Sequence, residues 1–304
     1  MAGEASMAGA RPQWPRCKHI AFGRSRTLLY QPMAISRRAV LKTLAATAAS
    51  TVTGFGAYGY LYERHQLSVT RANMPVAGLP PALAGFRIGF LTDVHRSLWV
   101  SHEDVSQAVV RLMDERPDLI VLGGDYVTWG DRQYVQRSAE DLALLSAPHG
   151  VYGILGNHDD DRDMPAALAA RGVQMLKDAR TRVTLRGEAI DLVGIRFWTK
   201  RAGDIAAIAR GATGFVILLA HDPRRLTEAA ALKIPLVLSG HTHGGQVVLP
   251  VAGAVAAQKF PVVAGIGRRD QTTMFVSRGL GTVYVPVRIN CPPEVAILTL
   301  QPAA

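Results

Sequence analysis

The sequence has few cysteines and few aromatic residues, and both shortages exclude classes of protein. Only two of its 304 residues are cysteines, Cys17 and Cys291, which excludes a cysteine-rich zinc site and a framework of internal disulfides. Aromatic residues make up 7% of the chain. This content does not predict the aromatic-lined groove on which proteins stack the bases of a nucleic acid strand. We therefore expect no specific nucleic acid partner.

The positive charge of the chain is concentrated at its N-terminus. The formal net charge is +10, of which residues 1–42 carry +7, leaving +3 for the remaining 262 residues. A balance of this size is ordinary for a globular domain and does not predict a polyanion-binding surface. Apolar residues make up 48% of the chain, which is ample for the core of one large α/β domain or two small ones.

Residues 36–61 have the order of an export signal, a charged segment followed by an apolar one. Arg37 and Arg38, with Leu41 and Lys42 behind them, resemble the twin-arginine signal of bacteria, although Val40 stands where that pattern usually has Phe. This resemblance implies the twin-arginine export machinery as a partner and a location outside the cytoplasmic membrane, in the periplasm or cell envelope. The alternative is a basic pair before a membrane helix. Residues 43–61 are close to the ~20 needed to span a bilayer, so an uncleaved anchor in contact with the membrane stays open.

These features divide the chain into three parts. Residues 1–65 form a leader with the signal and the apolar segment, and Met33 is a second candidate for the start of translation. We expect the part before Met33 to be disordered. Residues 66–85 hold a short strand and a linker rich in Pro and Gly, and the catalytic domain occupies residues 86–304.

Five apolar strands are predicted in the domain, and each ends in polar residues of metal-binding type. The strands cover residues 87–92, 118–122, 150–155, 215–219 and 234–238. Helices are predicted between them at 102–116, 132–145, 165–171, 203–210 and 223–231, and a meander of strands at 173–176, 181–186 and 189–195. In α/β sheets, ligands bind beyond the carboxyl ends of the strands. The polar groups after the five strands are therefore expected on one edge of one sheet: Asp93 and His95, Asp125, Asn157 to Asp159, His221, and His241 with His243.

The last of these groups, Gly240-His241-Thr242-His243, presents two imidazoles on a glycine-rich loop. Imidazole is the commonest metal ligand among side chains. Taken alone, the stretch could also be a histidine-rich surface turn. Five of the nine histidines fall within the polar groups after the strands, however, and this pattern favours a metal site.

In these five blocks, over about residues 86–300, the chain resembles the calcineurin-like metallophosphoesterase family. The resemblance implies an α/β fold, a four-layer αββα sandwich, with two metal ions at the edge where the strands end. One ion would be held by Asp93, His95, Asp125 and His243, and the other by Asp125, Asn157, His221 and His241. Such a mixed set of oxygen and nitrogen ligands suits Mn, Fe or Zn.

The resemblance also implies a reaction, the hydrolysis of a phosphodiester or phosphomonoester. Two ions can share a bridging hydroxide that attacks phosphorus. In the family the histidine of the Asn-His pair, here His158, is the general acid, and we expect Asp159 to orient its ring or to tune its charge. Thr128 stands where many relatives have an acidic residue or Arg. This departure leaves the shape of the pocket wall and the substrate preference open. Arg288 is a candidate for contact with the substrate.

Other functions remain compatible with this pattern. The chain could be a scaffold that keeps the fold without catalysis, which metal analysis would reveal. It could also act on nucleic acid or on a nucleotide-linked lipid. The relatives that hydrolyse such a lipid work in the cytoplasm, and the export signal argues against that location. Envelope polymers, lipid head groups and nucleotides are all candidate substrates.

Overall fold

A computed structural model describes residues 36–303, and the expectations for residues 1–35 lie outside the described part. By its contacts the chain divides into two compact units, Met1–Thr47 and Ala48–Ala304. Helix α1 spans Arg37–Leu61 and so includes the whole predicted apolar segment. Among the described helices, α1 included, none has both the length and the hydropathy to cross a bilayer.

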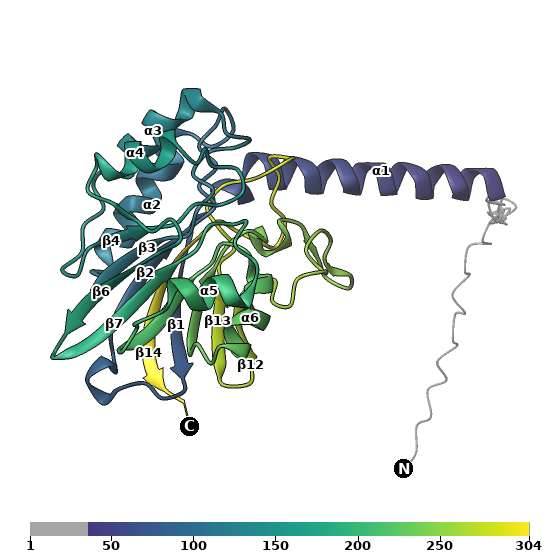
Figure 1. Ribbon diagram of the computed structural model, residues 1–304. Helices are drawn as coiled ribbons and strands as arrows, with labels where there is room; N and C mark the ends of the chain where they lie inside the picture. The colour runs from purple at the N-terminus through teal and green to yellow at the C-terminus, as the bar shows by residue number, and fades with distance from the viewer. Residues whose placement is uncertain (1–35, 304) are drawn as a thin grey trace, which may run out of the picture. The chain divides into compact units, whose positions relative to one another are not determined.

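The second unit contains two six-stranded sheets (Figure 1). The first has the order β1-β14-β2-β3-β4-β5, in which β2 to β5 run parallel and β14 is antiparallel to β2. Its strands are β1 Ser68–Val76, β2 Arg87–Leu91, β3 Leu119–Leu122, β4 Val151–Gly153, β5 Gln174–Met175 and β14 Glu294–Pro302.

The second sheet has the order β12-β13-β9-β8-β7-β6, with β13, β9, β8 and β7 parallel and the two edge strands antiparallel. Its strands are β6 Ala179–Leu185, β7 Glu188–Gly194, β8 Phe215–Leu219, β9 Leu236–Ser239, β12 Gly265–Arg269 and β13 Thr272–Val276. A small hairpin pairs β10, Val248–Leu249, with β11, Gly253–Ala254.

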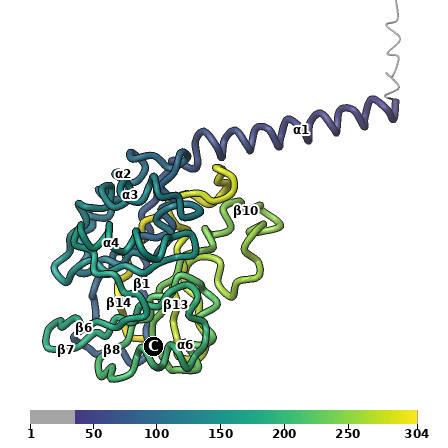
Figure 2. Tube along the Cα trace, turned by 45° about the horizontal axis from the view of Figure 1, so that its top comes forward, coloured from purple at the N-terminus to yellow at the C-terminus, as the bar shows by residue number. Residues whose placement is uncertain are grey.

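Helices cover the outer face of each sheet (Figures 1 and 2). On the first sheet lie α2 His102–Asp114, α3 Val135–Asp141 and α4 Asp163–Ala169, and on the second α5 Ala202–Ile208 and α6 Leu226–Ala231. Short 3₁₀ helices occur at Glu63–His65, Pro81–Leu83, Arg132–Tyr134, Pro223–Arg225 and His243–Gly245.

The apolar strands of the sequence pattern become buried on both faces. In β3, Leu119 and Val121 face the core between the two sheets, while Ile120 and Leu122 face the core beneath α2, α3 and α4. Alternation of side chains along a strand explains why such a strand must be apolar at every position. A third core lies between the second sheet and its helices. The αββα sandwich predicted from the sequence is thus the observed fold.

Two sequence expectations about the fold are wrong in detail. The short strand expected within residues 66–85 is present as β1, but it is longer than expected and belongs to the domain, because it pairs with β14 over nine positions of the first sheet. Pro75 is tolerated within β1 because this is an edge strand, where a missing N–H breaks no ladder. The predicted meander is also split. β5 pairs with β4 in the first sheet, whereas β6 and β7 form a hairpin in the second.

Candidate metal centre

Five loops meet where strands of both sheets end. They follow β2, β3 and β4 of the first sheet and β8 and β9 of the second. The expectation that all five lie on one edge of one sheet is therefore wrong, because the two sheets of the sandwich each supply part of the site. The polar groups that follow these strands supply two clusters of potential ligands, in each of which three ligand atoms lie within 4.8 Å of one another. The first cluster is Asp93, His95 and His243, and the second is Asp125, His221 and His241.

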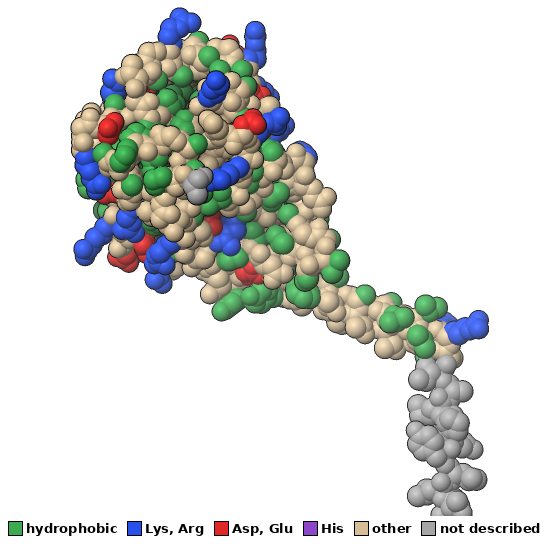
Figure 3. All heavy atoms as spheres, turned by 90° about the horizontal axis from the view of Figure 1, so that it is seen from below, with side chains coloured by type: hydrophobic (Ala, Val, Ile, Leu, Met, Phe, Trp, Pro, Cys, Tyr) green, Lys and Arg blue, Asp and Glu red, His purple; other side chains and the backbone are tan. Residues whose placement is uncertain are grey.

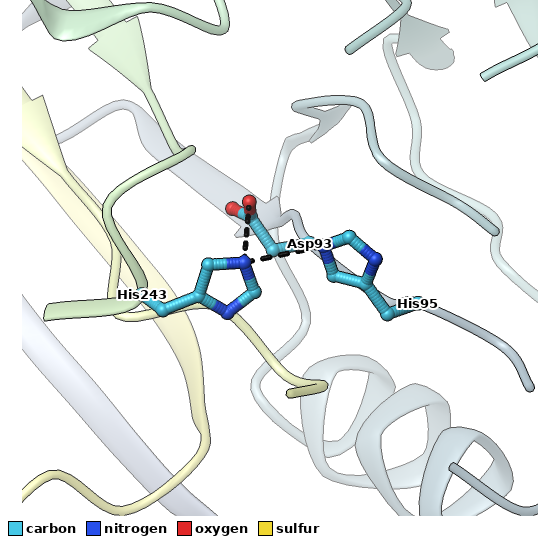
Figure 4. Close-up of side chains that lie close together, drawn as sticks. All are labelled: Asp93, His95 and His243. Carbon is cyan, nitrogen blue, oxygen red and sulfur yellow. Dashed lines mark hydrogen bonds and ion pairs between the residues drawn. The ribbon is translucent and has the colours of Figure 1, made fainter. Parts of the chain in front are cut away.

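The first cluster is buried and its imidazole nitrogens face inward (Figure 4). His243 Nε2 lies 3.4 Å from Asp93 Oδ1 and 3.2 Å from His95 Nε2. The Asp93 carboxylate is held from its other side by the His241 amide, 2.9 Å from Oδ1, and by the Thr92 hydroxyl, 2.9 Å from Oδ2. Its position is therefore fixed by the chain itself.

The second cluster is centred on Asp125, which also reaches the first. Asp125 Oδ2 lies 3.1 Å from His221 Nε2 and 3.5 Å from His95 Nε2. Its Oδ1 accepts a hydrogen bond from the His158 amide at 2.8 Å. One carboxylate oxygen thus faces histidines of both clusters, as a bridging ligand would require.

The other ring nitrogen, Nδ1, anchors three of the histidines. His221 Nδ1 donates to the Gly123 carbonyl at 2.8 Å, and His243 Nδ1 lies 3.3 Å from the Gly281 carbonyl. His95 Nδ1 lies 3.1 Å from the Thr128 hydroxyl. A donor role for Nδ1 leaves the Nε2 lone pair free for a metal, which is the usual arrangement around ligating histidines.

The backbone at the site is strained, and two glycines of the sequence motifs allow the close approaches that this backbone requires. Five of the clustered residues have left-handed φ angles, namely Asp93 (53°), His95 (49°), Asp125 (55°), His241 (74°) and His243 (52°). Such conformations are uncommon for residues other than Gly and gather at functional sites. Two motif glycines are needed for close approach, because a Cβ on Gly156 would overlap the Asp125 carboxylate and one on Gly240 would overlap that of Asp93.

Two buried atoms without hydrogen-bond partners fit a metal. Asn157 Oδ1 and His221 Nε2 are inaccessible to solvent and make no hydrogen bond within the described chain. The approach of His221 Nε2 to Asp125 is therefore close in distance but not a well-directed hydrogen bond. Orphaned polar atoms in a core are costly unless something else engages them. The residues present fit a site for transition-metal ions with oxygen and nitrogen ligands.

Neighbouring charges give the histidines of the site different pKa values. Burial alone would lower the pKa of His221, but the carboxylates of Asp125 and Asp93 outweigh it and raise this pKa to about 10. Burial and the charge of His221 lower the pKa of His241 to about 4. Burial alone would raise the pKa of Asp125, but His221 and His95 hold it well below its usual range. The buried Asp125 carboxylate is thus matched with a cation on His221, where a metal ion would exchange with the proton.

His158 lies beside the clusters and lines the same pocket. Its Nδ1 accepts a hydrogen bond from the Trp129 amide at 3.1 Å, which leaves the proton of the neutral ring on Nε2. Burial lowers the pKa of His158, which favours this neutral form.

The orienting role predicted for Asp159 differs from what the structure shows. Its carboxylate accepts amide hydrogens from Asp125 at 2.7 Å, Tyr126 at 2.7 Å and Gly156 at 2.9 Å. These contacts fix the loops that carry Asp125 and Asn157, while the His158 ring is held by the Trp129 amide. Asp159 therefore supports the ligand loops rather than the imidazole beside it in sequence.

Arg288 is also misplaced by the sequence interpretation. It is fully buried, and its guanidinium donates to the carbonyls of Cys291, Arg278 and Gly279 and of Gly281, whose carbonyl faces His243. Its role is to hold this loop against the ligands rather than to meet a substrate.

A pocket of about 380 Å³ opens over the clusters. Asp125, Asn157, His158, His241 and His243 line its polar floor. Aromatic residues that sequence reasoning missed stand beside the floor. Phe197 and Phe260 have ring centroids 5.2 Å from that of His241. Phe197 follows β7 at the edge where the ligand strands end, so the strand-end rule could have found it.

Comparison with known proteins agrees with this geometry. Residues 86–245 match the family described as calcineurin-like phosphoesterase. The metallophosphoesterase YkuE of Bacillus subtilis, itself uncharacterized, is 30% identical over 280 residues, covering 88% of this chain and 98% of YkuE. Phosphodiesterase YaeI of Escherichia coli is 31% identical over 281 residues, covering 88% of this chain and 99% of YaeI. The chain therefore belongs to the calcineurin-like metallophosphoesterases, a family dependent on two metal ions, and is a metal-dependent phosphoric ester hydrolase.

Proposed function

We propose that the chain is a phosphodiesterase with two metal ions that acts outside the cytoplasmic membrane. The observation that carries the catalytic part is the convergence of both ligand clusters and His158 on one pocket. Asp93, His95, Asp125 and His243 would hold one ion, and Asp125, Asn157, His221 and His241 the other. Bound there, the ions would supply Lewis acidity toward a phosphate and toward an attacking water.

His158 is the residue that would stabilise the leaving-group oxygen of the substrate. Nδ1 of the neutral ring accepts a hydrogen bond from the Trp129 amide, so the ring proton is on Nε2. This N–H can donate a hydrogen bond to a substrate oxygen in the pocket. A second proton on Nδ1 would oppose the amide N–H, so the arrangement favours hydrogen-bond donation from Nε2 over transfer from an imidazolium. This refines the general-acid role expected from the family resemblance.

Several features support a small phosphodiester as substrate. YaeI is named a phosphodiesterase. On the face shown in Figure 3, Lys and Arg side chains stand apart, with Asp and Glu side chains between them. That face lies away from the strand ends that carry the ligands, and no continuous basic stripe for a nucleic acid backbone runs across it.

The catalytic proposal is tested with purified protein loaded with Mn²⁺. We expect hydrolysis of bis-p-nitrophenyl phosphate to exceed that of p-nitrophenyl phosphate in kcat/KM. His158→Gln should lower kcat by roughly 10²-fold, the lower end of the range for acid–base groups, while the metal content by elemental analysis stays at two ions. Metal-loaded protein that hydrolyses neither ester would refute the proposal and revive the scaffold alternative.

The leaving group tests whether His158 assists departure, and the pH profile distinguishes its two possible roles. A nitrophenolate leaves with little help, whereas an alkoxide needs strong stabilisation, so His158→Gln should cost more with a methyl ester than with a nitrophenyl ester. A full general acid predicts, in addition, that wild-type kcat falls as pH rises through the pKa of the ring. A hydrogen-bond donor predicts no such limb.

The location is tested separately. A reporter fused to residues 33–65 should be exported in cells with the twin-arginine machinery and retained in cells without it. Replacing Arg37 and Arg38 together by Lys in the fusion is the matched control and should abolish export. Export that continues without the machinery would contradict this part of the proposal.

A further inference from the structure

A second groove, of about 480 Å³, lies next to the metal pocket. Its walls come from three loops that follow β2, β3 and β13, and they include Leu98, Trp99, Trp129, Tyr284 and Val285. We call these five residues the aromatic groove. Its volume is in the range of pockets that enclose small organic ligands.

The aromatic groove borders the metal pocket. Val283, Tyr284 and Val285 line both. The Trp129 ring packs on the Tyr284 ring at 5.4 Å and on the His158 ring at 4.5 Å between centroids. A molecule with its phosphate over the ligand clusters would therefore extend past His158 directly onto these rings.

The groove residues are unusually exposed for their type. Leu98 is 78% exposed, Trp129 66% and Tyr284 79%. Single exposed apolar side chains are ordinary, but a contiguous set beside a catalytic pocket marks a binding surface. The apolar surface continues to the end of α1, where the Tyr60 ring lies 6.1 Å from that of Trp99.

The chemistry of the lining selects the occupant. Among the described residues that line the groove there is no Lys or Arg, and the charged side chain present is Asp131. An anionic polymer such as a nucleic acid would meet an acid and no cation there. A hydrocarbon chain, in contrast, gains from every apolar wall and requires no polar partner.

We propose that the aromatic groove binds the hydrocarbon chain of an amphipathic phosphoester whose phosphate lies at the metal centre. This rests on the proposed function and narrows it to substrates with an alkyl or acyl tail beside the phosphate. Each methylene removed from water contributes roughly fourfold in affinity when fully buried. For an open groove we expect a smaller total gain.

The test compares ethyl with octyl p-nitrophenyl phosphate, both below their micelle concentrations. We expect kcat/KM of wild type to be at least about tenfold higher for the octyl ester. Leu98→Ser and Tyr284→Ser should reduce this ratio to less than about threefold. Leu144→Ser is the matched control, because Leu144 is 76% exposed and lies outside both pockets; its ratio should equal that of wild type.

A binding measurement gives a second readout that does not need turnover. Octyl phosphonate should quench or shift tryptophan fluorescence at a concentration about tenfold lower than ethyl phosphonate, and Leu98→Ser should remove that difference. If both esters are hydrolysed with equal kcat/KM, the groove inference is overturned while the proposed function stands. If neither is hydrolysed, the proposed function fails, and equal binding of the two phosphonates then overturns the groove inference as well.

Discussion

The two ligand clusters are built from similar residues but differ in the burial of one histidine. Asp93, His95 and His243 are at most 3% exposed, and hydrogen bonds hold the Asp93 carboxylate from behind. In the second cluster Asp125 and His221 are each 1% exposed, whereas His241 is only partly buried and has the rings of Phe197 and Phe260 as neighbours. The difference between the clusters therefore lies in one ligand. Within the clusters, His241 is the ligand least enclosed by the core.

The largest expected effect comes from the residue that joins the two clusters. Asp125→Asn removes the charge that faces both His221 and His95. We expect the variant to bind fewer than one metal ion per chain and to lose about 10³-fold or more in kcat/KM, because several kcal/mol of electrostatic stabilisation depend on the ions. Elemental analysis and bis-p-nitrophenyl phosphate kinetics measure this. Retention of one tightly bound ion would show that the clusters are independent.

Removing one histidine from each cluster tests the difference in burial directly. His95→Ala and His241→Ala should both abolish most activity, but they should differ in the stability of the metal-free protein. His95 is fully buried, so its loss leaves a cavity and lowers Tm by about 5 °C or more, since each kcal/mol shifts Tm by about 2–4 °C in a domain of this size. His241→Ala should stay within about 2 °C. Calorimetry with a chelator present makes the measurement, and equal shifts would remove the distinction.

The pH dependence of metal uptake should separate the clusters next. In the metal-free protein the pKa of His221 is about 10, so the ring keeps its proton at every lower pH and a metal at Nε2 must release it. Apparent affinity at the second cluster should therefore rise about tenfold per pH unit between about pH 6 and 9. His241, with a pKa of about 4, is already neutral there and adds no slope.

Titration calorimetry in two buffers of different ionisation enthalpy counts the released protons. About one proton per second-cluster ion is expected near pH 7. His241→Ala is the control that should keep this proton release, however weak its binding becomes. Metal uptake without proton release would contradict the raised pKa of His221.

The ligands could be predicted from the sequence because their positions follow from topology. Polar residues that follow neighbouring parallel strands must share an edge, and this holds for Asp93 and Asp125 in the first sheet and for His221 and His241 in the second. That the two edges meet at one site does not follow from this rule. The sandwich was expected from the resemblance to the family, and strands such as β3, apolar on both faces, agree with it. Their role as ligands remains a prediction of that geometry.

Side-chain direction within loops could not be predicted in the same way. Asp159 is adjacent to His158 in sequence, yet its carboxylate turns back onto the amides of Asp125 and Tyr126. Arg288 points into the carbonyls of its own loop instead of the pocket. Loops carry no periodicity from which such directions follow, so long-range contacts decide them. The aromatic groove was missed for this reason too, since its residues come from three separate loops.

The smallest expected effect comes from a residue that holds the partly buried His241 ring in place. Phe260→Ala removes one of the two rings that flank it, at a centroid distance of 5.2 Å. Aromatic pairs contribute about 0.5–1.5 kcal/mol beyond burial, which converts to roughly two- to tenfold in kcat/KM. Because the ligand itself remains, the metal content should not change, and Phe260→Tyr should restore the rate. A loss beyond about a hundredfold, or loss of metal, would mean that the position of His241 depends on its surroundings as strongly as the positions of Asp93 and His95 do. The contrast between the clusters would then fail.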